Sequence, residues 1–352
     1  MLGIDLFSGA GGMSAGALAS GIDVRYAVES DRNAAATFAL NHQKTTLFNR
    51  DIKQVRGADL ALPKGNKSVV VFGGPPCQGF STSNQKNRGA ANKNNWLFRE
   101  YLRLVREVTP DWVVFENVKG LIEAEKGFFL DAVLGGIEAA GYVTSHFVLN
   151  SAEYGVPQRR NRLFIIGSRH GVRISAPTPT IGKHVTVSQA LIDLPVLENG
   201  DAPDEEAYSG PAHTIYAKSR RGSLKSCHNN LVTQNAPYIV ERYSHIPEGG
   251  NWEDIPKRLM KNYADISRCH TGIYRRLKSD EPAVVIGNFR KNMLVHPWKD
   301  RGLSVREAAR LQSFDDSFRF AGSIGFQQQQ VGNAVPPLLA KAVFQQMLTY
   351  GK

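Results

Sequence analysis

The segment GGPPCQGFS at residues 73–81 places one of only three cysteines in the chain directly after two prolines. Proline fixes φ and so restricts the backbone that carries Cys77. A free cysteine is more often a small buried hydrophobe than a nucleophile, but the glycines around Cys77 and the basic residues after it favour a reactive thiolate. Glu116, in the sequence ENV, follows a separate apolar run. Both residues follow apolar runs that we interpret below as strands. A thiol and a carboxyl group at the ends of neighbouring strands predict that Cys77 is a nucleophile and Glu116 an acid.

A glycine-rich turn, SGAGG at residues 8–12, follows the apolar run LGIDLF. Glu29 lies 20 residues after Gly9, where an acidic group accepts hydrogen bonds from ribose hydroxyls in dinucleotide-binding folds. The sequence GAGGMS lacks the third glycine of GxGxxG, which disfavours a cofactor with a pyrophosphate. A nucleoside cofactor without phosphates remains possible. Asp51, in NRDI, is a candidate for contact with an adenine amino group, although an ordinary loop aspartate is a fair alternative.

Apolar runs that read as strands alternate with helical segments in the first half of the chain. The predicted strands span residues 2–7, 23–29, 69–74, 111–118 and 162–168, and an amphipathic helix is predicted at 97–108. This alternation predicts an α/β fold with a mostly parallel sheet covered on both faces. Ligands of such sheets bind at the carboxyl ends of the strands, so we expect the glycine turn, Cys77 and Glu116 to share one edge.

The net charge of +11 and the pI near 9.5 favour a polyanionic partner. Residues 215–300 contain 15 Lys/Arg against 8 Asp/Glu, so most of the excess positive charge lies in this window. A basic face that only contacts solvent is an equal alternative to a nucleic-acid-binding surface. We find neither an apolar run of about 18 residues nor a signal-peptide pattern. Three cysteines without a CxxC pair suit a reducing compartment, which predicts a cytoplasmic protein.

Six segments follow one another from Asp5 to Pro337 and carry a family resemblance. They read DLFSGAGGMSAG, GGPPCQGFS, ENV, QRRNR, RGLSVREAARLQSF and QVGNAVPP. In order and spacing they resemble the DNA (cytosine-5)-methyltransferases of bacterial or phage type. The resemblance implies a Rossmann-like S-adenosylmethionine-dependent methyltransferase fold. It implies a catalytic domain at 1–182 plus 328–352 and a smaller target-recognition domain at 183–327.

The resemblance also implies a reaction. Cys77 would add as thiolate to C6 of a flipped cytosine, and Glu116 would hold N3 and the exocyclic amine. C5 then takes a methyl group from S-adenosylmethionine, which leaves S-adenosylhomocysteine, and no metal takes part. Arg160 and Arg162 of QRRNR match arginines that steady the base and its phosphate, although in isolation they read as a basic cap on a strand. The base that removes the C5 proton is not identified.

The remaining site residues also follow from motif positions. The sequence NNW before Leu97 departs from the stretch with Asp and Arg that is common in the family. The cofactor pocket is expected at Phe7, Gly9, Gly11, Glu29, Asp51, Ile52, Leu97 and Asn333.

We expect double-stranded DNA as the partner, because the target must be extruded from a duplex and the basic window can offset that cost. The long polar segment after Cys77 is interpreted as a lid, and a plain surface loop is the alternative. Predicted DNA contacts are Lys86, Arg88, Lys93, Arg220, Arg221, Arg275, Arg276, Arg290 and Lys291.

The resemblance implies one of two roles for the protein. It is either the modification enzyme of a restriction-modification system, with a cognate restriction endonuclease, or an orphan methylase. We expect a monomer. The alternative functions are an RNA cytosine-5 methyltransferase and a catalytically silent DNA-binding relative. Retention of Cys77, Glu116 and Arg160 argues against the silent relative.

Overall fold

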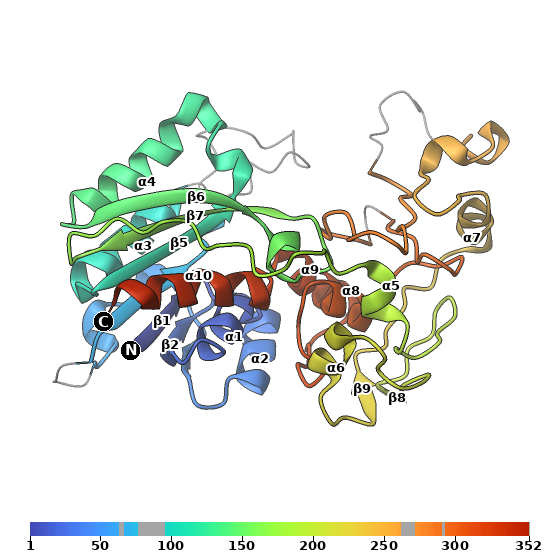
Figure 1. Ribbon diagram of the computed structural model, residues 1–352, viewed down its shortest axis with the longest axis horizontal. Helices are drawn as coiled ribbons and strands as arrows, with labels where there is room; N and C mark the ends of the chain where they lie inside the picture. The colour runs from blue at the N-terminus through green and yellow to red at the C-terminus, as the bar shows by residue number, and fades with distance from the viewer. Residues whose placement is uncertain (63–66, 77–95, 262–271, 291–292, 352) are drawn as a thin grey trace. The chain divides into compact units, whose positions relative to one another are not determined.

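The structure is a computed structural model that describes residues 1–62, 67–76, 96–261, 272–290 and 293–351 (Figure 1). The chain divides into two compact units. The first comprises Met1–Tyr154, Asn161–Thr180 and Pro337–Lys352, and the second comprises Gly155–Arg160 and Ile181–Pro336. The second unit therefore includes residues 155–160, 181–182 and 328–336, which lie in the catalytic domain predicted from the sequence.

The first unit is built on a seven-stranded sheet with the order β3-β2-β1-β4-β5-β7-β6. Its strands are β1 (Leu2–Leu6), β2 (Asp23–Val28), β3 (Thr46–Phe48), β4 (Val69–Gly73), β5 (Trp112–Val118), β6 (Val143–Asn150) and β7 (Asn161–Ser168). The pairs from β3 to β5 are parallel, whereas β7 runs antiparallel to both β5 and β6. The predicted α/β fold with a mostly parallel sheet is confirmed.

Helices cover both faces of this sheet (Figure 1). The helices of the unit are α1 (Gly12–Leu18), α2 (Arg32–Asn41), α3 (Phe98–Val108), α4 (Phe128–Glu138) and α10 (Pro337–Tyr350). Leu102 of α3 and Val133 of α4 join one core cluster with Val71 and Phe115 of the strands. Phe72, whose side chain points to the other face because strand residues alternate, packs on Phe344 of α10 at 5.0 Å between ring centroids.

The last helix, α10, packs against the first helix, α1. A Cβ added at Gly16 of α1 would lie 2.5 Å from Ala340 Cβ and 2.7 Å from the Pro337 carbonyl oxygen. Ser20 Oγ donates to the carbonyls of Gly16 and, at 3.2 Å, Lys341. Only glycine at position 16 therefore allows α10 to approach α1 this closely.

The second unit has short elements and a small sheet. Its helices and strands are α5 (Val187–Leu191), β8 (Glu205–Ala207), α6 (Ile215–Arg221), β9 (Ser226–His228), α7 (Pro237–Ser244), α8 (Val305–Leu311) and α9 (Ile324–Asn333). β8 and β9 pair antiparallel. One apolar core cluster of the unit centres on Tyr243 and Tyr274. Among the described residues of the whole chain, no helix is long and apolar enough to cross a membrane.

Candidate active site

The glycine turn after β1 has a backbone that few other residues would adopt. Phe7, Gly9 and Gly11 have φ values of +62°, +55° and +96°. A Cβ added at Gly11 would clash with the His42 ring, so this position requires glycine for both its conformation and its contact. A Cβ at Gly9 would meet nothing within 4 Å, so a ligand can approach the backbone closely at this point of the turn.

Glu29 follows β2 and lies against this turn. Its Oε2 accepts the Gly9 N–H at 2.8 Å, and its Oε1 accepts the Asp31 N–H at 2.7 Å. Burial raises the pKa of Glu29, and the two backbone donors oppose that shift. Each carboxylate oxygen can accept a second hydrogen bond, so the residue fits the predicted ribose contact.

Two buried groups beneath the turn were not singled out from the sequence. Ser14 Oγ of α1 donates to Asp5 Oδ2 of β1 at 2.6 Å, and burial raises the pKa of Asp5 to about 8. His42 packs on Phe38 at 4.4 Å between centroids, and burial lowers its pKa to about 4. A hydrogen-bonded strand-to-helix pair on one side and an aromatic pair on the other hold the turn in shape.

The other predicted cofactor residues of the first unit also follow strand ends. Asp51 comes after β3 and caps a 3₁₀ turn, Ile52–Gln54, by accepting the Lys53 N–H at 2.9 Å. Ile52 is buried, and Leu97 is the N-cap residue of α3. Because β3, β2, β1 and β4 are adjacent and parallel, their carboxyl ends lie along one edge. Asn333 instead ends α9 in the second unit and is exposed.

Glu116 and Arg162 form a nearly buried ion pair. Arg162 Nε lies 2.9 Å from Glu116 Oε1, and the two side chains are only 12% and 10% exposed. The antiparallel pairing of β5 with β7 sets Arg162 opposite Val118, two residues beyond Glu116. Burial lowers the pKa of Arg162, and Glu116 opposes that shift. The pair fixes the direction of the carboxyl group.

The segment that leads to the predicted nucleophile runs beside this carboxyl group. A Cβ at Gly74 would lie 2.5 Å from Glu116 Oε2, so the segment approaches this closely only because residue 74 is glycine. Asn117 Nδ2 donates to the Pro75 carbonyl at 3.0 Å and anchors the first of the two prolines on β5. Cys77 itself lies outside the described residues.

Arg160 belongs to the second unit, where its buried side chain is hydrogen-bonded to the backbone. It is 2% exposed, and its guanidinium donates to the carbonyls of Ile286 at 2.9 Å and Gly332 at 2.8 Å. The nearby Gln158 amide donates to the buried Gln312 side chain at 2.9 Å. These contacts join QRRNR to two distant motifs and differ from the predicted contact of Arg160 with a flipped base.

Several predicted DNA contacts are engaged within the second unit. Arg276 is 5% exposed and donates to Asp300 and to the backbone carbonyls of Tyr243, Ile246, His296 and Lys299. Its donors are thus engaged within the unit, and its contact with DNA stays a prediction. Arg275 is half-buried and Arg290 is exposed. Lys86, Arg88, Lys93 and Lys291 lie outside the described residues.

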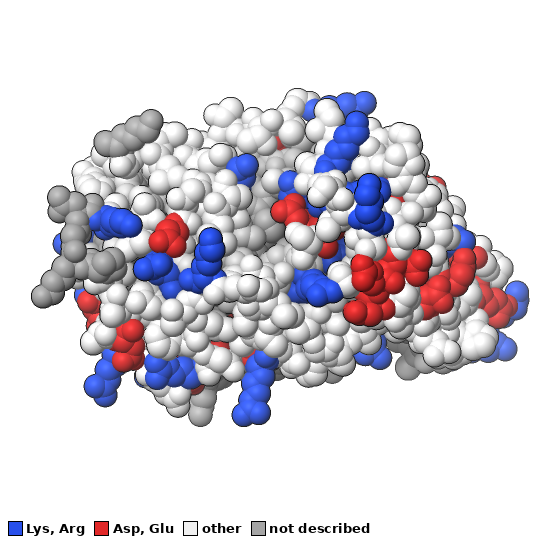
Figure 2. Space-filling view, turned by 90° about the horizontal axis from the view of Figure 1, so that it is seen from below, with Lys and Arg blue, Asp and Glu red and all other residues white. Residues whose placement is uncertain are grey.

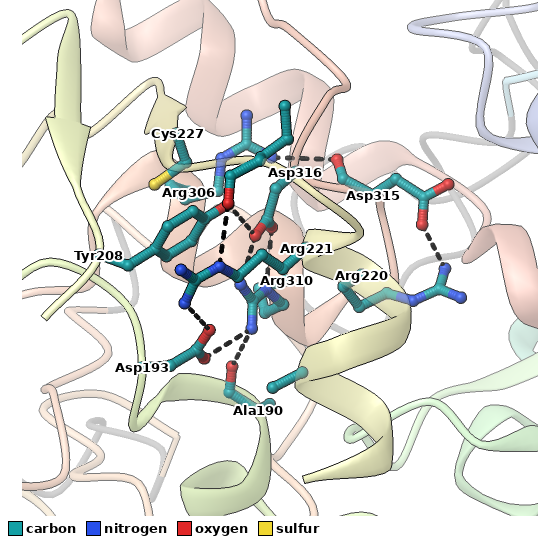
Figure 3. Close-up of polar contacts among 12 residues, drawn as sticks. Ala190, Asp193, Tyr208, Arg220, Arg221, Cys227, Arg306, Arg310, Asp315 and Asp316 are labelled. Carbon is teal, nitrogen blue, oxygen red and sulfur yellow. Dashed lines mark hydrogen bonds and ion pairs between the residues drawn. The ribbon is translucent and has the colours of Figure 1, made fainter. Parts of the chain in front are cut away.

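Arg220 and Arg221 of α6 border a buried polar network (Figure 3). Arg220 pairs with Asp315 at 2.8 Å, and the Arg221 guanidinium lies 3.8 Å from the centroid of the Tyr208 ring. At the centre Arg310 of α8 is fully buried. It donates to Asp193 at 2.9 Å, to both carboxylate oxygens of Asp316 and to the Ala190 carbonyl.

This network explains the charges of RGLSVREAARLQSF. Burial alone would raise the pKa of Asp316, but hydrogen bonds from Arg310 outweigh burial and hold that pKa below its ordinary value. Arg301 and Glu307 form a second buried pair with two bonds, of 2.9 and 2.8 Å. The motif therefore supplies the second unit with a paired ionic interior.

Replacing Arg310 by alanine is expected to lower the free energy of unfolding by about 3–5 kcal/mol, because the buried Asp193 and Asp316 would lose their closest cation. Arg221, at 3.7 Å from Asp193, and the Tyr208 hydroxyl, at 2.7 Å from Asp316, would remain as their partners. Urea denaturation followed by tryptophan fluorescence measures this. The exposed Arg290→Ala is the control, with an expected effect within about 0.5 kcal/mol. Equal effects of the two substitutions would contradict a stabilising network.

The surface charge is mixed on the face in Figure 2. Acidic side chains gather over one part of this face, and lysine and arginine side chains are spread between neutral ones. The sequence has one acidic run, residues 201–206, whose four acidic side chains are exposed in the structure. Net charge alone therefore does not locate the nucleic-acid surface.

Comparison with known proteins gives concordant matches along the chain. The family model for C-5 cytosine-specific DNA methylase matches residues 1–349. The Type II methyltransferase M1.HphI of Haemophilus parahaemolyticus is 35% identical over 348 residues, which cover 98% of this chain and 86% of that protein. M.XorII of Xanthomonas oryzae pv. oryzae is 34% identical over 373 residues, covering 99% and 84%.

Solved structures agree with these matches. A putative DNA modification methyltransferase encoded within an E. coli prophage has a TM-score of 0.81 and 26% identity, with 99% of both chains covered. The S. pombe Dnmt2 methyltransferase, at 15% identity and a TM-score of 0.63, covers 100% of this chain and 99% of its own, and it shows the shared fold. Because the family model spans nearly the whole chain, the protein belongs to the C-5 cytosine-specific DNA methylase family and is a DNA methyltransferase.

Proposed function

We propose that this protein methylates C5 of a flipped cytosine in a specific duplex DNA sequence through a covalent adduct between Cys77 and C6. The observation that carries the proposal is the position of Glu116. Its Oε1 is held by Arg162, while its Oε2 faces Gly74, three residues before Cys77. One carboxyl oxygen is thus oriented by a cation, and the other is directed toward the segment that carries the thiol.

The two groups divide the first step between them. The Cys77 thiolate forms a bond to C6, the C5=C6 double bond opens, and N3 takes up a proton from Glu116. The resulting enamine is nucleophilic at C5. After C5 is methylated, a base removes the C5 proton, the electrons restore C5=C6 and Cys77 leaves as thiolate. N3 returns its proton to Glu116 in this step, so the product is neutral and the acid is regenerated. The nearly buried Arg162 keeps Glu116 in one direction through these steps.

Bound S-adenosylmethionine supplies an electrophilic methyl group. In this proposal the backbone of the glycine turn contacts the cofactor, and Glu29 accepts hydrogen bonds from the ribose hydroxyls. Asp51 and Ile52 hold the adenine. Phe7 and Leu97 line the same pocket, and Asn333 is a further candidate for contact with the cofactor. The products are methylated DNA and S-adenosylhomocysteine, with no metal required.

The relatives M1.HphI and M.XorII are Type II methyltransferases, which supports a role in a restriction-modification system. We propose that the protein acts as a monomer on cytoplasmic, nucleoid DNA, either beside a cognate restriction endonuclease or as an orphan methylase. Arg162 and the exposed Arg290 remain our candidates for contacts with the base and the DNA backbone. The other candidates are Lys86, Arg88, Lys93, Arg220, Arg221, Arg275 and Lys291.

Bisulfite sequencing tests the function directly. The parent chain and Cys77→Ser are expressed separately in a host without cytosine methylation, and the genomic DNA is converted and sequenced. We expect protected cytosines in one short motif with the parent only. Protection with both chains would contradict the role of Cys77, and protection with neither would direct the test to methyl transfer onto RNA.

DNA affinity is expected to fall steeply with salt, because binding releases counterions from the phosphates. For Z phosphate contacts the logarithm of the association constant should change with a slope of about −0.9Z against the logarithm of salt concentration. Fluorescence anisotropy with a labelled duplex between 50 and 200 mM salt, roughly the range in which such losses become large, measures the slope. A flat response would contradict a phosphate-binding surface.

A further inference from the structure

Helix α3 contacts the turn that follows β3 through one arginine. Arg103 Nη2 donates to the carbonyls of Ile52 at 3.0 Å and Val55 at 2.9 Å. Its Nε donates to Glu100 at 2.8 Å, and its Nη1 donates to Glu107 at 2.7 Å. The two carboxylates lie one turn before and one turn after Arg103 on the same helix, so they fix the guanidinium in the direction of the turn.

Glu107 contacts the far end of the same segment. Its Oε2 accepts the Gly57 N–H at 2.6 Å. A Cβ at Gly57 would lie 2.7 Å from Glu107 Cβ, so this close approach depends on glycine. Arg103 and Glu107 together hold residues 52–57 at both ends, and we call this pair the α3 clamp.

The clamped segment begins where the adenine contact is proposed. Asp51 caps the turn, and the Val55 N–H donates to the Ile52 carbonyl at 3.1 Å. The side chains of Ile52 and Val55 are buried, whereas Asp51 is exposed. A short 3₁₀ turn has few internal hydrogen bonds, so external contacts decide its position.

Helix α3 is itself fixed to the sheet. Tyr101 Oη donates to the carbonyl of Val71 in β4 at 3.2 Å or Val114 in β5 at 3.0 Å. The helix also begins directly after Leu97, another residue of the proposed cofactor pocket. One rigid element thus carries a pocket residue at its start and the clamp one to three turns later.

We propose that Arg103 and Glu107 are positioning residues that set the affinity for S-adenosylmethionine by holding Asp51 and Ile52 in place. This inference rests on the proposed function, in which these two residues contact the adenine. The hydrogen bonds of Arg103 and Glu107 are to α3 itself and to residues 52–57, so loss of the clamp should weaken cofactor binding while leaving turnover at saturating cofactor close to that of the parent.

The test compares Arg103→Met, Arg103→Lys and Glu107→Gln with Arg106→Met in the full chain. Arg106 is an exposed arginine on the same helix and serves as the matched control. Isothermal titration with S-adenosylhomocysteine gives Kd, and initial rates with duplex DNA give KM and kcat. We expect Arg103→Met to raise Kd and the cofactor KM about tenfold. Lysine presents a single ammonium instead of a fork of donors and should restore only part of the affinity.

The outcomes separate the clamp from the function on which it rests. No binding of S-adenosylhomocysteine to the parent chain would overturn the proposed function and the clamp with it. Binding by the parent that weakens in Asp51→Ala but not in Arg103→Met or Glu107→Gln would overturn the clamp alone. If Arg103→Met fails to fold, Glu107→Gln and Arg103→Lys decide. A fall in kcat equal to the rise in KM would indicate a general structural role and contradict the proposal.

Discussion

Replacing Cys77 by serine is expected to reduce methyl transfer by at least about 10³-fold, which corresponds to about 4 kcal/mol in the barrier. A hydroxyl is far less acidic than a thiol, so serine would present almost no anion to attack C6 at neutral pH. Duplex binding should persist, because no phosphate contact is removed. Transfer of a tritiated methyl group measures turnover, and fluorescence anisotropy measures binding.

The proposed covalent step gives this prediction a second readout. A duplex with 5-fluorocytosine at the methylated position has no C5 proton to lose, so the adduct with Cys77 cannot break down after methylation. The parent should then migrate with the DNA on a denaturing gel, and Cys77→Ser should not. An adduct formed by the serine variant would show that another residue is the nucleophile.

Cys227 provides a matched control within the same chain. It is fully buried beside the network of Figure 3, and burial raises the pKa of its thiol to about 11. Its thiol is therefore protonated, and a flipped cytosine cannot reach it. Cys227→Ala should retain the adduct and the turnover of the parent, apart from any loss of stability.

The sheet was largely predictable because buried parallel strands read as apolar runs. The predicted strand at residues 162–168 corresponds to β7, Asn161–Ser168. Its antiparallel direction was not predictable, because a strand pattern contains no direction. β6 was missed, since VTSHFVLN lies at the edge of the sheet and mixes exposed, half-buried and buried positions.

The site was predictable where a residue follows a strand end. The Gly9 to Glu29 hydrogen bond links two such positions in neighbouring strands. The Glu116 to Arg162 pair depends on the register between antiparallel strands, which the sequence does not reveal. The α3 clamp was not predictable either, because three of its five hydrogen bonds are to the backbone of Ile52, Val55 and Gly57.

The count of basic residues does not by itself separate structural arginines from arginines that could face DNA, for a specific physical reason. An arginine has five donors and can satisfy several carbonyls at once, so a basic residue can hold a loop together instead of facing DNA. Arg276 does this with four carbonyls, whereas Arg290 is exposed, and the two are indistinguishable by composition. The DNA contacts of the second unit must therefore be sought among its exposed cations.

Glu116→Gln is expected to lower kcat by roughly 10²–10⁴-fold, the range for loss of a general acid. Glutamine is close in shape and can still hydrogen-bond N3 and the exocyclic amine, but it has no proton to transfer when Cys77 adds to C6. The substitution also removes the negative charge beside the buried guanidinium of Arg162. Single-turnover rates at saturating DNA and cofactor measure the chemical step.

The control for this change is Glu123→Gln, an exposed glutamate that follows β5 in the same unit. It should leave kcat and the thermal midpoint near those of the parent. Glu116→Gln should still bind duplex DNA and S-adenosylhomocysteine, since its loss is confined to the step in which N3 is protonated. A rate within a few-fold of the parent would show that N3 receives its proton elsewhere. An equal loss of DNA binding and turnover would assign Glu116 to holding the base instead of to proton transfer.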